Sequence, residues 1–168
     1  MDTTAMSAQD MRQDILDLSA ASGMAATDVS EAVYQAISGS VATADAANFV
    51  SQANQLSVAG FTSLSNATDV LTTTLNAYGL SADQVTGISN VLIQTQNLGK
   101  TSVDELSASM GKAISTGSAY GVNLENLSTA YVELTKGGIA TAEATTYLSG
   151  LLNEIGRASC RERVCLYV

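Results

Sequence analysis

The chain has 168 residues and a formal net charge of −9, and it contains no histidine. So acidic a protein repels phosphate backbones and anionic membrane surfaces, which argues against specific nucleic-acid binding, and the lack of histidine excludes the familiar Ser-His-Asp triad. No run approaches the ~20 apolar residues that a membrane-spanning helix needs, so we expect no membrane segment.

Apolar residues recur at helical spacing through the chain and alternate only weakly, which predicts an all-α fold. Helix ends are marked by glycine followed by an apolar residue, because such a glycine adopts the left-handed conformation cheaply and the next side chain packs back on the last turn. Five such pairs occur: Gly23-Met24, Gly60-Phe61, Gly79-Leu80, Gly121-Val122 and Gly138-Ile139. We expect about eight short-to-medium helices, at roughly 7–21, 28–38, 43–58, 66–78, 82–98, 103–116, 124–136 and 142–155.

Polar residues that cap helix starts precede these helices. Segment 27–31, Ser81 with Gln84, and Ser102 with Glu105 fit the capping box, in which a cap side chain and a Glu or Gln three residues later satisfy each other's backbone N–H groups. Further expected caps, each with an acid in the following turn, are Thr43, Asn66, Asn123 and Thr141. Acids placed there complement the helix dipole, so much of the acidity needs no ligand to explain it.

A faint internal similarity links two segments of the chain. Residues 76–84 resemble residues 118–126, with Tyr78 and Tyr120 offset by 42 residues. That is about two helices with their turns, and helix-pair repeats near this length form stacked solenoids. We therefore expect a solenoid-like helical array, with an irregular array as the alternative.

Gly99-Lys100-Thr101-Ser102 looks like the end of a phosphate-binding loop. Such a loop needs a glycine five residues before its last glycine, and here that position is Gln94. The preceding residues also read as a helix and not as a strand followed by a turn. We interpret the segment as a junction, in which Gly99 ends one helix and Ser102 caps the next.

Other candidates for chemistry are weak. The acid pairs Asp14 with Asp17 and Asp104 with Glu105 fall in first turns or on polar faces, where solvated carboxylates are the usual case. The choice of Lys112 as a catalytic base would be arbitrary. Cys160 and Cys165 are the only cysteines. The tyrosines Tyr34, Tyr78, Tyr120, Tyr131 and Tyr147 are expected in the core, with a partner-binding patch as the alternative.

A series of phrases between residues 13 and 156 is similar to a known family. In chain order they are LSAASGM, AVYQAIS, LNAYGLSAD, QTQNLGKTSVDEL, AYGVNLE and GIATAEATTYL. Together they resemble the core region of the phage minor tail or tape measure family. None of them is a catalytic motif, so we expect no enzyme and assign no catalytic, cofactor-binding or metal-ligating residue.

The resemblance implies a structural component of a phage or prophage tail, involved in tail assembly and tail length determination. Its implied partners are the tail tube protein, tail assembly chaperones and tail tip proteins, with self-association inside the tube. Its implied location is the virion tail, after assembly in the host bacterial cytoplasm. Tape measure proteins are much longer, so we expect this chain to be a fragment. The alternatives are a generic helical protein–protein interaction scaffold and a hydrolase.

The composition changes abruptly after Gly156. Residues 157–168, RASCRERVCLYV, contain three arginines and both cysteines. The run IGRASCRERV resembles a translated sequencing adapter. We therefore expect a helical module at 1–156 and a non-native segment at 157–168, with a genuine basic tail as the alternative.

Overall fold

The computed structural model describes the backbone of residues 7–165 and the side chains of residues 7–157. Its elements are α1 (Ala8–Ser22), α2 (Ala26–Ser38), α3 (Ala46–Ala59), α4 (Leu64–Tyr78), the 3-10 turn η1 (Ala82–Gln84), α5 (Val85–Leu98), α6 (Val103–Ser109), α7 (Gly111–Ala119), α8 (Leu124–Lys136) and α9 (Thr141–Cys165). No strand occurs in residues 7–165, so the predicted all-α class is confirmed.

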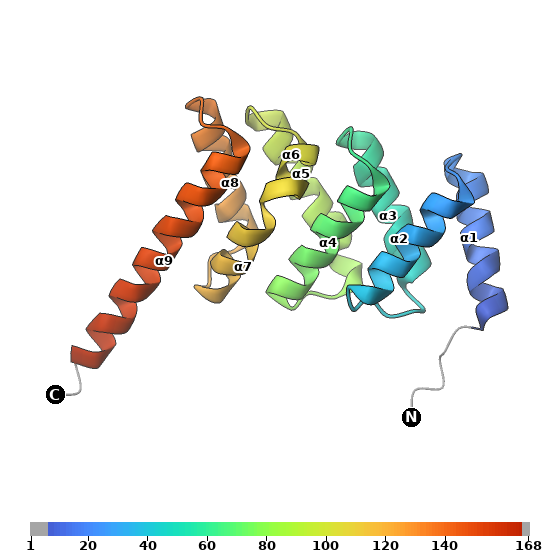
Figure 1. Cartoon of the computed structure of the whole chain (residues 1–168), viewed down its shortest axis with the longest axis horizontal. Helices are drawn as coiled ribbons and strands as arrows, with labels where there is room; N and C mark the ends of the chain where they lie inside the picture. The colour runs from blue at the N-terminus through green and yellow to red at the C-terminus, as the bar shows by residue number, and fades with distance from the viewer. Residues whose placement is uncertain (1–6, 166–168) are drawn as a thin grey trace.

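The helices form two layers, each with its members side by side along the long axis of the molecule (Figure 1). One layer contains α1, α3, α5 and α8, and the other contains α2, α4, the α6–α7 pair and α9. Successive helices of the first layer begin at Ala8, Ala46, Val85 and Leu124, which are 38 or 39 residues apart. Each helix pair therefore stacks on the pair before it. The similar segments 76–84 and 118–126 begin at the ends of α4 and α7, which pack together.

The core lies between the two layers and runs from α2 to α9 as one cluster of buried side chains. Its largest fully buried members include Phe49, Leu71, Leu92, Ile114 and Tyr131. These side chains come from α3, α4, α5, α7 and α8, so successive pairs share apolar contacts. Helix α1 is different, because none of its residues is buried.

Several predicted caps form, and others are displaced. Asn123 accepts the N–H of Asn126 at 2.9 Å, and the capping box predicted at Ser81 and Gln84 forms. Ser102 caps α6 as predicted, but the Glu105 carboxylate accepts from Thr141 instead of completing a capping box. The prediction for Asn66 is wrong, because Ser63 accepts its N–H at 3.1 Å and starts α4 two residues earlier. Helices α2 and α3 likewise do not begin at 27–31 or Thr43, but at Ala26 and Ala46.

Four of the five predicted glycine stops have left-handed backbones: Gly23, Gly79, Gly121 and Gly138. Gly60 also ends its helix, α3, but the left-handed backbone predicted for it is wrong, since its φ is −94° and Phe61 takes the positive φ instead. A Cβ at Gly60 would lie 2.7 Å from Cβ of Val103 in α6. Glycine is needed there because the side chain of Val103 packs directly against its backbone, not because of its conformational freedom.

The predicted helix 103–116 is divided into α6 and α7 at Met110. The N–H of Met110 still donates to Leu106 O at 2.7 Å, and the N–H of Ile114 donates to Met110 O at 2.9 Å. The interruption is therefore a local distortion. It occurs where Gly111, a poor helix former, follows a fully buried methionine.

Helix α9 continues past its predicted end at residue 155 and reaches Cys165. Gly156 does not take a left-handed backbone, and the arginines and glutamate that follow are good helix formers. Side chains after Arg157, including both cysteines, lie outside the described residues. The predicted boundary between 1–156 and 157–168 therefore stays a prediction.

Candidate functional site

The Gly99–Ser102 segment is a helix junction, as predicted. Helix α5 ends at Leu98, and Gly99 is extended, with φ −97° and ψ 179°. The N–H of Lys100 donates to Thr135 Oγ1 of α8 at 3.2 Å. Ser102 Oγ accepts the N–H of Glu105 at 3.1 Å and caps α6. The N–H of Lys100 thus joins this junction to α8, and the N–H of Glu105 is used in the cap of α6.

Hydroxyl groups also connect this junction to the next helix pair. Thr101 Oγ1 and Thr141 Oγ1 are 2.8 Å apart, and Thr141 Oγ1 donates to Glu105 Oε2 at 2.7 Å. Thr141 is the first residue of α9 and is buried. The carboxylate of Glu105 therefore links two stacked pairs. This acid–base candidate thus has a structural role as a hydrogen-bond acceptor between helices.

Asp104 forms a similar link, in this case from α6 back to the preceding helix pair. Its Oδ1 accepts hydrogen bonds from Thr62 Oγ1 at 2.8 Å and from Asn66 Nδ2 at 2.9 Å. The bond from Thr62, followed by the bond from Asn66, lowers the pKa of this exposed carboxyl group. The remaining acid–base candidates lie on separate helices, with Asp14 and Asp17 on α1 and Lys112 exposed on α7.

The tyrosines do not share one environment. Tyr131 is fully buried, as expected, and its Oη lies 2.5 Å from Thr145 Oγ1. Burial raises the pKa of Tyr131 to about 12. The core prediction is wrong for Tyr34, Tyr120 and Tyr147, whose exposed fractions are 72%, 43% and 52%. Helical spacing shows which residues share a face, but not whether another helix covers it.

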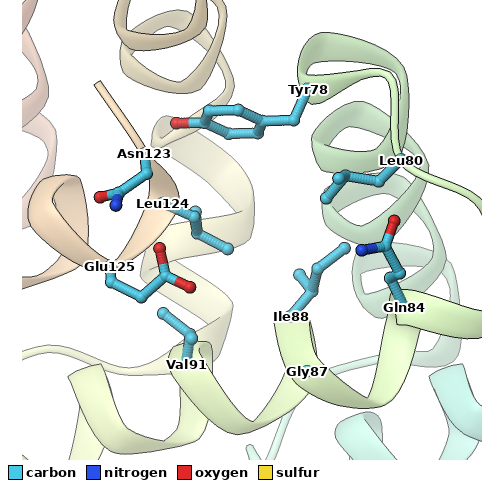
Figure 2. A pocket seen from close by; sticks show the side chains of 9 residues that line it. All are labelled: Tyr78, Leu80, Gln84, Gly87, Ile88, Val91, Asn123, Leu124 and Glu125. Atoms are coloured by element: carbon cyan, nitrogen blue, oxygen red, sulfur yellow. The ribbon is translucent and has the colours of Figure 1, made fainter. Parts of the chain in front are cut away.

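A cavity of about 400 Å³ opens between the start of α5 and the start of α8 (Figure 2). Its apolar lining comprises Leu80, Ile88, Val91 and Leu124. Tyr78, at the end of α4, lies across one side, and Gln84, Asn123 and Glu125 supply polar groups. This combination of apolar walls with a few polar groups is typical of binding sites.

A second hollow, of about 110 Å³, continues from this cavity between α5 and α8. Val91 and Glu125 line both hollows, so they form one depression, which we call the α5–α8 groove. Its far part is lined by Leu98, Ser128 and Val132, among others. Glu125 therefore lies near the middle of the groove.

Two hydroxyl groups of the groove have no hydrogen-bond partner among the described residues. They are Oη of Tyr78 and Oγ of Ser128, and the atoms themselves are buried. Ser128 as a whole is 5% exposed. Burial, followed by the negative charge of Glu125, raises the pKa of Tyr78, which therefore stays protonated at neutral pH. The Glu125 carboxylate is exposed and forms no ion pair within the described part of the chain.

Sequence reasoning considered Tyr78 as a core residue, with a partner-binding patch of tyrosines as the alternative, and missed the groove. The groove exists because α5 and α8, which begin 39 residues apart, lie side by side. The sequence signals that point to this adjacency are the regular spacing of the helix starts and the similarity of residues 76–84 to residues 118–126.

The described residues contain no helix long and apolar enough to cross a membrane. They also contain no group of three or more His, Cys, Asp or Glu side chains placed to hold a metal ion.

The protein is thus an all-α array of stacked helix pairs, with the α5–α8 groove on its surface. The sequence matches the family described as phage-related minor tail protein over residues 12–162. Because the match covers most of the chain, the protein belongs to this family and is a phage tail protein. No curated protein and no solved structure matches it.

Proposed function

We propose that this protein is a tape measure protein module that acts in tail assembly and in tail length determination of a phage or prophage. The observation that carries the proposal is the family match over residues 12–162. It is supported by the ordered phrases that resemble the tape measure core. The role is structural, with no enzymatic activity and no cofactor.

The geometry favours a role in assembly over a role as the measuring segment itself. A ruler of continuous helix gains about 1.5 Å per residue. Here the chain turns back between the two layers after each helix, with α6 and α7 counted as one, and each new pair advances the array by only about the width of a helix. We therefore propose that the module contacts other tail components, with the tube protein, the assembly chaperones and the tip proteins as its partners, while a longer helical segment measures.

The proposal can be tested by deletion in the phage that carries the gene, with tails counted and measured by electron microscopy. Loss of the whole gene should abolish tails of normal length, and a plasmid copy should restore them. Normal tails without the gene would refute the tape measure assignment.

A second deletion separates assembly from measurement. Removing residues 46–84, one helix pair, should block or impair assembly because the flanking pairs lose their packing partners. If this segment were instead a stretch of ruler helix, its 39 residues would correspond to about 58 Å of tail length. Intact tails shortened by that amount would contradict the assembly role.

A further inference from the structure

Two features of the α5–α8 groove point to a ligand. Its walls are apolar, and a carboxylate that forms no ion pair within the described part of the chain lies at its middle. Leu98, at the far end, is 59% exposed, although it is large and apolar.

The dimensions of the groove fit a peptide segment. From Ile88 to Leu98, α5 rises about 15 Å, the length of roughly ten residues of helix or four to five of extended chain. The larger hollow, about 400 Å³, can take a bulky side chain, and the smaller one, about 110 Å³, a short one. Two hollows in a row suit alternate anchors on one segment, as in the recognition of a helix by a groove.

The charge of the groove selects the chemistry of the segment. Among the described residues, Glu125 is the only charged side chain that lines either hollow. A basic side chain placed between two apolar anchors would set its aliphatic stem on Val91 and its charged end against this carboxylate. The whole chain is acidic, with 16 acids against 7 basic residues, so it attracts a basic partner and repels a second copy of itself.

We propose that the α5–α8 groove is a docking site for a segment of a partner protein that carries one lysine or arginine between aliphatic residues. The aliphatic residues enter the two hollows, and the basic residue pairs with Glu125. The proposal does not depend on the tape measure assignment, since it rests only on the groove.

The test begins with selection of random 12-residue peptides on the immobilised 168-residue chain. The affinity of the enriched peptides for the free protein is then measured by fluorescence anisotropy. We expect enriched peptides to contain one Lys or Arg flanked by aliphatic residues. Replacing that basic residue with glutamine should weaken binding roughly five- to tenfold, as expected for a charge-assisted hydrogen bond.

Two variants of the protein locate the binding. Glu125→Gln should weaken the peptide roughly five- to tenfold and remove most of its salt dependence. Gly87→Leu should weaken it more than about tenfold, because Gly87 lines the groove and its added side chain would occupy the groove. A Cβ at Gly87 meets no atom within 4 Å, and circular dichroism of the variant checks that it keeps the helical fold.

Matched controls exist for both variants. Glu133→Gln removes one exposed charge from the same helix outside the groove, and Gly150→Leu changes a glycine in α9 that also has no neighbour within 4 Å. Neither control should change the affinity by more than about twofold, which is the scatter expected of remote surface changes.

Three results would overturn the proposal. They are a selection that enriches no peptide, enriched peptides without a basic residue, and binding that Glu125→Gln and Gly87→Leu leave unchanged.

Discussion

Replacing Gly60 with alanine should destabilise the protein through a clash and not through backbone strain. The Cβ of the new side chain would lie 2.7 Å from Cβ and Cγ2 of Val103, which is 0.7 Å short of the 3.4 Å where ordinary contact begins. Val103 cannot yield easily, because it is fully buried and its N–H donates to Gln96 Oε1 at 2.8 Å. Overpacking of this kind costs about 1–3 kcal/mol.

The assay is denaturant and thermal unfolding followed by circular dichroism. At this size, about 1 kcal/mol corresponds to roughly 2–4 °C in the midpoint. The control is Gly150→Ala, which lies inside α9 with free space around it and should stabilise the protein by about 0.5–1 kcal/mol. The same substitution should therefore have opposite signs at the two glycines.

Substitution with asparagine separates two explanations for the glycine at position 60, a steric clash with Val103 and the left-handed backbone that the sequence suggests. Asparagine tolerates left-handed backbone better than alanine does. At Gly23, with φ 71° and no neighbour within 4 Å, asparagine should be the milder replacement. At Gly60 it should be at least as harmful as alanine, because it carries the same Cβ and more atoms. If asparagine were clearly milder than alanine at Gly60, the reasoning from close approach would be refuted.

Three further outcomes are expected. Tyr131 has a pKa of about 12 in the folded protein, against 10.0 for the free side chain. Its contribution to stability is therefore full below pH 10 and is lost as the pH rises toward 12, at about 1.4 kcal/mol per pH unit. Chemical denaturation across this range should show a smaller loss of stability for Tyr131→Phe than for the wild type. The lowered pKa of Asp104 makes stability depend on pH in the opposite direction. The contribution of Asp104 to stability is present above the free value of 3.8 and is lost as the pH falls through the pKa of the folded state. Asp104→Asn should therefore destabilise the protein at neutral pH and be as stable as the wild type in strong acid. Calorimetry should detect no ATP binding, because the N–H of Lys100 is already used by Thr135, and micromolar affinity would contradict the assignment of this segment as a helix junction.

Local signals in the sequence predict most of the secondary structure. A left-handed glycine followed by an apolar residue ends a helix wherever nothing crosses nearby, as at Gly79 and Gly121. At Gly60 the same dipeptide has another cause, because Val103 lies 43 residues further along the chain and only packing brings it close. Local patterns do not distinguish the two cases.

The candidate site was less predictable for the same reason. Tyr78 and Glu125 lie on different helices, and they share a groove only because the helix pairs stack side by side. The exposure of Tyr34 is a comparable case, since the helical spacing that places it on α2 does not show that its side is left uncovered. Sequence spacing defined the helix faces, and tertiary stacking decided their neighbours.

The absence of buried residues in α1 has a mechanical consequence. In a stacked array each pair is held mainly by its neighbours, and among the described helices α1 packs mainly against α2 and α3. Helix α1 adds only partly buried side chains, such as Met11, Ile15 and Leu18, to the core. A force applied at the N-terminus of this chain should therefore peel α1 away first and at low tension. The helix pairs behind it should then unfold one after another, so that the protein extends in discrete steps under force.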